Sequence, residues 1–188
     1  MLAGYKLVIS NTNKPHSLAG SAYNDRRAEC AEALDDLRTL MPELPSLCAL
    51  TPVQFETMSA VIKNEKARRR AEHAVYEEDR AVSACEALRN GDLAEFGKLM
   101  YGSHLSLKDL FEVSCMELDT LVDLAMRHPG VLGSRMTGGG FGGCTITLIR
   151  ENETASFIEK TGAAYKEKTG LTASFYVAEP GDGVHLLA

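Results

Sequence analysis

The sequence predicts an α+β fold, in which helices pack on one face of a mainly antiparallel sheet. Residues 5–10 are apolar and β-branched, and alternating apolar segments recur after residue 130. The residues between them are rich in charge and in helix-forming side chains. A glycine-rich stretch at 138–143 lies between two strand-like segments, which indicates a hairpin. Strands at both ends of a sequence, with helices between them, favour this class over an alternating α/β fold.

The first predicted elements are a strand over 5–10 and a helix, joined by turn-forming residues at 11–16. We expect Ser21 to cap the helix, because a serine hydroxyl can accept a hydrogen bond from a free amide of the first turn. Apolar side chains recur at helical spacing, which predicts a buried face of Tyr23, Cys30, Leu34 and Leu37.

The central part of the chain is predicted to be helical. Thr51, Pro52 and Gln54 form a capping box with proline at the first helical position. A long charged helix follows over about 63–90, and its basic run at 66–70 is surrounded by glutamates. We therefore interpret that run as a solvated, ion-paired helix face and not as a nucleic-acid site.

Further helices and strands follow towards the carboxyl terminus. Asn90 and Gly91 end the long helix, and Asp92 caps the next, whose buried stripe is predicted to be Leu93, Phe96, Met100 and Leu107. A capping box at Ser114–Glu117 predicts one more helix, which ends at residues 128–130. Strands are expected over 144–149, 172–177 and 184–187, with a helix over 154–168.

Composition narrows the function classes. The net charge of −6 argues against a protein that binds nucleic acid through its phosphates. No apolar run approaches the roughly 20 residues that span a bilayer, and no signal peptide is evident, so we expect no membrane partner. Five scattered cysteines without a CxxC pair predict reduced thiols and a cytoplasmic location, with no metal site.

The glycine stretch formally matches a dinucleotide fingerprint through Gly138, Gly140 and Gly143. That fingerprint requires a helix after the loop, whereas a strand follows here, so we reject it. No P-loop motif is present either. The pattern leaves two interpretations open: a close-packing hairpin, or a set of backbone amides that line an anion site.

Residues 135–144, Arg-Met-Thr-Gly-Gly-Gly-Phe-Gly-Gly-Cys, resemble the third conserved motif of the galactokinases, which belong to the GHMP small-molecule kinases. The match continues through residues 10–13, 21–30, 103–114 and 172–177, in the order of the family. It covers essentially the whole chain. The sugar-recognition motif and the serine-rich phosphate loop of the amino-terminal half have no counterpart in the sequence.

The resemblance implies a ferredoxin-like C-terminal domain with extra helices, spanning 1–188 as a single domain. It implies that Tyr23 contacts galactose. It also implies that a glycine loop lies beside the sugar and the phosphate loop of the other half; its residues are Thr137, Gly138, Gly139, Gly140, Phe141, Gly142 and Gly143. ATP and Mg²⁺ would be bound mainly by the absent half, which also supplies the catalytic aspartate and arginine.

In the family, ATP phosphorylates the anomeric hydroxyl of α-D-galactose. We expect the isolated chain to be inactive, to pair with an amino-terminal half in cis or in trans, and to self-associate through the exposed domain interface. Two alternatives stay open: another sugar kinase, for instance one that acts on N-acetylgalactosamine, and a non-catalytic galactose-sensing paralogue.

Several other polar residues are expected to have structural roles. Arg135 is predicted to form an ion pair, and His16 and His104 to be hydrogen-bonded without binding metal. Ser134 has no histidine and acid partners nearby in the sequence, so we expect no nucleophilic role for it. Asp109 and Glu112 are expected to cap a helix end.

Overall fold

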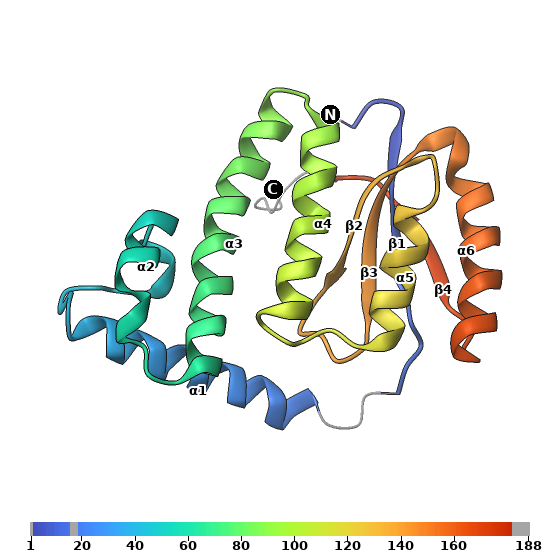
Figure 1. Ribbon diagram of the computed structural model, residues 1–188. Helices are drawn as coiled ribbons and strands as arrows, with labels where there is room; N and C mark the ends of the chain where they lie inside the picture. The colour runs from blue at the N-terminus through green and yellow to red at the C-terminus, as the bar shows by residue number, and fades with distance from the viewer. Residues whose placement is uncertain (1, 16–18, 182–188) are drawn as a thin grey trace, which may run out of the picture.

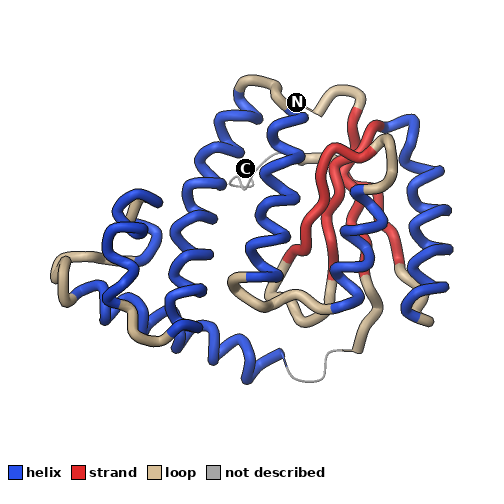
Figure 2. Tube along the Cα trace, viewed as in Figure 1, coloured by secondary structure: helices blue, strands red, loops and turns tan. Residues whose placement is uncertain are grey.

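The computed structural model describes residues 2–15 and 19–181, and within them the chain forms six α-helices and one four-stranded sheet (Figure 1). Figure 2 shows some of the helices next to the strands and others farther away, on the left of the view. In chain order the elements are β1 Tyr5–Asn11, α1 Ala19–Arg38, α2 Pro52–Met58, α3 Glu65–Arg89, α4 Leu93–Asp109, α5 Met116–Met126, β2 Val131–Thr137, β3 Cys144–Arg150, α6 Thr154–Thr169 and β4 Ser174–Ala178.

The sheet has the strand order β2-β3-β1-β4, and every neighbouring pair is antiparallel. Helices α5 and α6 cover one face, where Val8, Ile149 and Phe157 form a buried cluster. Val8 and Ser10 are buried while Leu7 and Ile9 are only half-buried, because successive side chains of a strand point to opposite faces. The predicted α+β class is confirmed.

Helix α4 packs against edge strand β2 with unusually close backbones. A Cβ atom at Gly97 would lie 2.2 Å from the carbonyl oxygen of Leu132, and one at Gly133 would lie 2.1 Å from the carbonyl oxygen of Gly97. The register of β2 shifts between Val131 and Gly133, which marks a bulge at this contact. Glycines at both positions therefore let the helix approach the strand.

Helices α1, α2 and α3 form a second hydrophobic cluster beside the sheet (Figure 1). The capping box at Thr51 and Gln54 is present as predicted. His73 is also buried, at the contact between α3 and α4. Its Nδ1 lies 2.8 Å from Ser106 Oγ, and its ring centroid lies 4.5 Å from that of Phe111. Burial lowers the pKa of His73 to about 4, so this histidine is neutral at pH 7.

Some predictions about helix ends and faces are wrong. Helix α1 begins at Ala19, so Ser21 lies inside it and is not its cap. The N-cap of α5 is Cys115, one residue after the predicted cap, and the Ser114 hydroxyl donates to Asp119 Oδ1 over 2.5 Å. Of the stripe predicted for α4, only Met100 is fully buried. The strand expected at 184–187 and His16 lie outside the described residues.

The basic run at 66–70 is ion-paired as predicted, but it is not wholly solvated. Arg68 pairs with Glu65 and Arg69 with Glu112 at the surface. Arg70, in contrast, is fully buried and pairs with Glu29 and Glu112. Helical spacing within the run placed this one arginine between α1 and the end of α4, where acidic partners were available.

Candidate functional site

A cavity of about 460 Å³ lies between α1 and the turn that joins β2 to β3. The turn, 138–143, is called the glycine hairpin below. Tyr23 from α1 and Gly138 and Gly139 from the glycine hairpin line this cavity together, although more than 110 residues separate them in the sequence. The remaining lining residues are Arg26, Arg27, Cys30, Leu107, Phe111 and Val113.

One face of α1 forms a wall of the cavity. Tyr23, Arg26, Arg27 and Cys30 occupy positions i, i+3, i+4 and i+7, which share a face of a helix. Tyr23 is 54 % exposed, so the prediction of a buried face that includes it is wrong at this position. Arg27 is exposed, whereas Arg26 bonds to the backbone oxygens of Phe111 and Glu112. The phenol and guanidinium groups give the wall both donors and acceptors for a polar ligand.

The opposite wall is the glycine hairpin, whose backbone requires its glycines. Gly138 has φ +84°, and Gly140 has φ +83°, values that L side chains adopt only with strain. A Cβ atom at Gly140 would also lie 2.1 Å from the carbonyl oxygen of Val113. Gly139, in contrast, has open space around its Cα. Strand β3 follows the turn, which confirms that the dinucleotide fingerprint does not apply.

The glycine hairpin is fixed to the rest of the domain at two points, Phe141 and Gly143. The Phe141 amide donates to the carbonyl oxygen of Val113 over 2.7 Å, and the Phe141 ring packs in a cluster with Val113, Leu118 and Met136. The Thr12 amide and hydroxyl both donate to the carbonyl oxygen of Gly143, over 2.9 and 2.8 Å. The cavity wall is therefore preorganised and does not depend on a ligand for its shape.

Strand β2, which leads into the glycine hairpin, is held by His104. The Met136 amide donates to His104 Nδ1 over 3.3 Å, so Nδ1 is an acceptor and Nε2 is the ring nitrogen that carries a proton. Nε2 lies 3.4 Å from Asp119 Oδ1, a long contact that leaves this buried nitrogen without a full hydrogen bond among the described residues. Burial by itself would raise the pKa of the Asp119 carboxyl. The contacts of this carboxylate with His104, Ser114 and Lys108 have the larger combined effect and lower its pKa to about 2.

The other polar residues singled out from the sequence have structural partners. Arg135 pairs with Glu77 over 3.3 Å, as predicted, and the Ser134 hydroxyl lies 2.9 Å from that of Thr147. Glu112 does not cap a helix, contrary to prediction: it has φ +54° and pairs with Arg70. In the described part of the chain, no group of three metal-ligating side chains gathers, and no helix could span a membrane.

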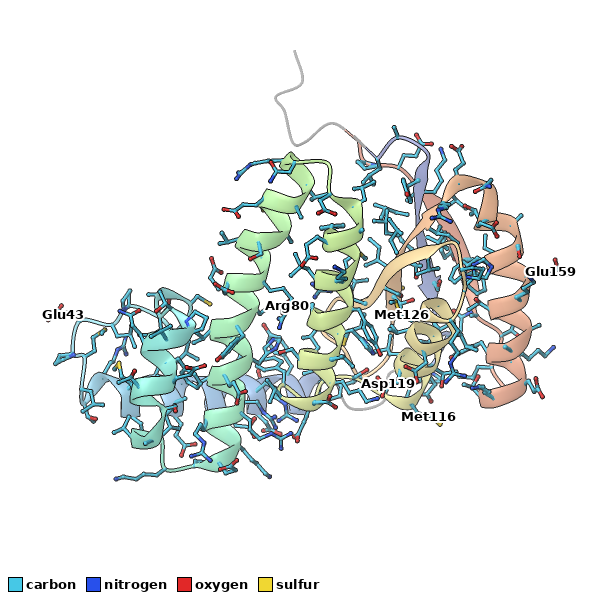
Figure 3. The ribbon with its side chains drawn as sticks, turned by 45° about the horizontal axis from the view of Figure 1, so that its top comes forward. Glu43, Arg80, Met116, Asp119, Met126 and Glu159 are labelled. Atoms are coloured by element: carbon cyan, nitrogen blue, oxygen red, sulfur yellow. The ribbon has the colours of Figure 1, made fainter. Side chains whose placement is uncertain are left out.

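A second cavity of about 500 Å³ lies between α3, α4 and the sheet face opposite α5. Apolar side chains such as Leu7, Phe96 and Ile146 line most of it, and Arg80 is among its polar lining residues. Figure 3 labels Arg80 on α3 and Asp119 on α5. None of the site residues expected from the sequence lines this cavity, so the smaller cavity is the candidate site.

Sequence reasoning missed three groups at the candidate site: Arg26, Arg27 and Val113. The first two had a usable signal, since they share a helix face with Tyr23. Val113 had none, because its role depends on a backbone oxygen that reaches a hairpin 28 residues later in the sequence.

Comparison with known proteins gives three findings. Residues 84–167 match the family described as GHMP kinases C terminal. The chain is 50 % identical to the galactokinase of Bacillus subtilis (strain 168) over 186 residues, which are 99 % of this chain and 47 % of that protein. It is also 50 % identical to the galactokinase of Clostridium acetobutylicum over 182 residues, with 97 % and 46 % covered. The chain thus spans about half the length of these relatives.

Among solved structures, the chain superposes on Lactococcus lactis galactokinase complexed with galactose with a TM-score of 0.94. The two are 45 % identical, and the match covers 97 % of this chain and 47 % of that one. Leishmania major mevalonate kinase in complex with R-mevalonate, 22 % identical, matches with a TM-score of 0.54 over 95 % of this chain and 44 % of that one, a likeness of fold.

Proposed function

Because residues 84–167 match the family described as GHMP kinases C terminal, and the chain is 50 % identical to part of a galactokinase, we propose that it forms the carboxyl-terminal half of a galactokinase. In this proposal the complete enzyme transfers a phosphoryl group from ATP to the anomeric hydroxyl of α-D-galactose. The chain contributes one wall of the sugar site. The observation that carries the proposal is the meeting of Tyr23 with Gly138 and Gly139 at one cavity, in a fold that superposes closely on a galactose-complexed galactokinase.

The proposed division of labour follows from the chemistry of each wall. The Tyr23 hydroxyl can exchange hydrogen bonds with a sugar hydroxyl, while the absence of side chains at Gly138 and Gly139 lets the ligand approach the backbone. Phosphoryl transfer depends chiefly on positioning and charge neutralisation, and Mg²⁺ supplies part of that neutralisation when it is bound with the nucleotide. In this proposal ATP and Mg²⁺ are bound mainly by the other half.

The test combines the purified chain with the amino-terminal half of a close relative and measures ADP production that depends on galactose. The chain alone should show none, because the catalytic aspartate and arginine are expected in the other half. Tyr23→Phe in the combined enzyme should raise KM for galactose about tenfold, the effect of losing one hydrogen bond to the sugar. Tyr176→Phe is the matched control, since Tyr176 is 58 % exposed on β4 and lines neither cavity.

Two results would contradict the proposal. One is ATP turnover by the chain alone in the presence of galactose. The other is an equal KM in the Tyr23 and Tyr176 variants. A panel of sugars that includes N-acetylgalactosamine tests the choice of substrate in the same assay, because a hydrogen-bonding site discriminates between sugars through their substituents.

Two further parts of the proposal concern the state of the protein. All five cysteines are free, which supports a reducing, cytoplasmic location that cell fractionation would test. Exposed apolar side chains such as Leu40 and Val53 support self-association of the chain when its other half is missing. A monomeric mass in light scattering at high concentration would count against that association.

A further inference from the structure

We propose that Arg70 is a positioning residue for the candidate sugar cavity, because it ties the helix that carries Tyr23 to the loop that supports the glycine hairpin. The consequence for galactose rests on the proposed function. The mechanical link between the two walls does not.

The first link joins α3 to α1. The Arg70 side chain is 1 % exposed, and its Nε donates to Glu29 Oε2 over 2.7 Å. Arg26 donates to the same carboxylate oxygen over 3.0 Å. Glu29 lies six residues beyond Tyr23 on α1, so this contact fixes the position of α1 along its axis and its rotation about that axis where it borders the cavity.

The second link joins α3 to the loop after α4. Arg70 donates to Glu112 Oε2 over 2.6 Å and to the carbonyl oxygen of Leu110. Glu112 has φ +54°, a left-handed conformation that costs a non-glycine residue free energy unless its surroundings hold it. The contact with Arg70 lowers the pKa of Glu112, so the carboxylate is charged and holds the loop in this conformation.

The third link carries the loop to the glycine hairpin. Val113 follows Glu112 directly, and its carbonyl oxygen accepts the 2.7 Å hydrogen bond from the Phe141 amide. The same oxygen occupies the space that a Cβ atom at Gly140 would need. A displacement of Glu112 would therefore move Val113 and, with it, the wall that Gly138 and Gly139 form.

The guanidinium group suits this role better than an ammonium group would. Arg70 uses Nε and both terminal nitrogens on three partners in different directions, and a planar fork holds such a set in one geometry. A lysine would keep the charge but could not satisfy all three acceptors from the same position. Arg70→Lys therefore tests geometry separately from charge.

The rival explanation is that Arg70 only stabilises the helices. Arg80→Lys is the matched control, because Arg80 lies on the same helix and pairs with a glutamate, Glu77, but does not line the candidate site. The measurement is amide hydrogen exchange by NMR in the isolated chain. One probe is the Phe141 amide, and the reference probe is the Leu148 amide in the middle of β3.

We expect Arg70→Lys to speed exchange at Phe141 by about tenfold relative to Leu148, the loss of roughly one charge-assisted hydrogen bond. Arg80→Lys should leave the ratio unchanged. In the enzyme combined with an amino-terminal half, Arg70→Lys should raise KM for galactose more than it lowers kcat. If Arg70→Lys does not fold, Glu112→Gln tests the same link and should act in the same direction.

Equal acceleration at Phe141 and Leu148 would overturn the proposal, because it would mean that the variant lowers global stability alone. A ratio equal to that of Arg80→Lys would overturn it as well. If the unaltered combined enzyme does not phosphorylate galactose, the proposed function fails, yet the exchange ratio still decides whether Arg70 couples the two walls.

Discussion

Three adjacent glycines of the hairpin allow the cost of a side chain to be separated into its causes. Gly139 has neither a positive φ nor a neighbour within 4 Å of a built Cβ, Gly138 has φ +84° with open space, and Gly140 has φ +83° with a backbone oxygen 2.1 Å away. Alanine at each position therefore adds one cause at a time.

The magnitudes follow from this geometry. Gly139→Ala should change the free energy of unfolding by less than about 0.5 kcal/mol, as at other open positions. Gly138→Ala should cost about 1 kcal/mol, the strain of alanine in the left-handed region. Gly140→Ala adds a collision between the new Cβ atom and the Val113 carbonyl oxygen. To relieve it, the hairpin and Val113 would have to move apart by about 1 Å, which would break the Phe141–Val113 hydrogen bond. Strain and the lost bond together should cost about 3 kcal/mol.

The assay is urea unfolding of the isolated chain at 25 °C, followed by circular dichroism, with the three variants measured side by side. The slope of the free energy against urea should be unchanged, because the same surface is exposed on unfolding. If Gly140→Ala lowered the free energy of unfolding no more than Gly138→Ala does, the Val113 carbonyl oxygen would not lie in close contact with Gly140 in solution. The explanation of the wall as preorganised would then be refuted.

Other contacts lead to predictions for stability and titration. Gly97→Ala should lower the free energy of unfolding in urea by about 2 kcal/mol, because the new Cβ would collide with the Leu132 carbonyl oxygen. Gly102→Ala on the same helix would meet only a flexible arginine side chain and should be neutral or stabilising. Equal effects of the two variants would refute the close packing of α4 on β2. The pKa of His73 is about 4 in the folded chain and 6.5 in the unfolded chain, so as the pH falls the unfolded state binds the proton first. The contribution of His73 to the free energy of unfolding is therefore complete above pH 6.5, and about 2 kcal/mol of it is lost by pH 5. His73→Gln should reduce that loss in urea melts at pH 7 and pH 5, and an unchanged loss would contradict the assignment. NMR titration of the Asp119 carboxyl should give a pKa near 2, and a midpoint at its ordinary 3.8 would show that its contacts with His104 and its other partners do not form.

The sequence predicts elements well where a local physical rule decides them. The capping box at Thr51, the end of α3 at Asn90 and the hairpin at 138–143 all depend on residues within a few positions of one another. The error at the start of α5 involves a side-chain contact that the capping rule does not consider. The Ser114 side chain is directed towards the charged acceptor Asp119, to which its hydroxyl donates, and α5 begins one residue later than predicted, with Cys115 as its N-cap.

The site itself was predictable only in part. The glycine motif and Tyr23 were identified by resemblance, and helical spacing would have added Arg26 and Arg27 to the same wall. The buried arginine was not predictable, because Arg70 looks like its neighbours in a basic run until α1 and the loop after α4 fold against it. Contacts between residues about 40 positions apart, such as those of Arg70, produce no periodic pattern in the sequence.

The position of β1 in the middle of the sheet has a consequence for how the chain folds. Its partners are β3, at 144–150, and β4, at 174–178, so both of its ladders join residues more than 130 positions apart. Pairings of such high contact order form slowly, because the entropy of closing a long loop is lost before any contact is gained. On a ribosome, β1 is synthesised before the other elements of this domain and must wait until nearly all of them have been made. During that interval its apolar residues, Leu7 to Ile9, are the segment that a chaperone or a second unfolded chain would meet.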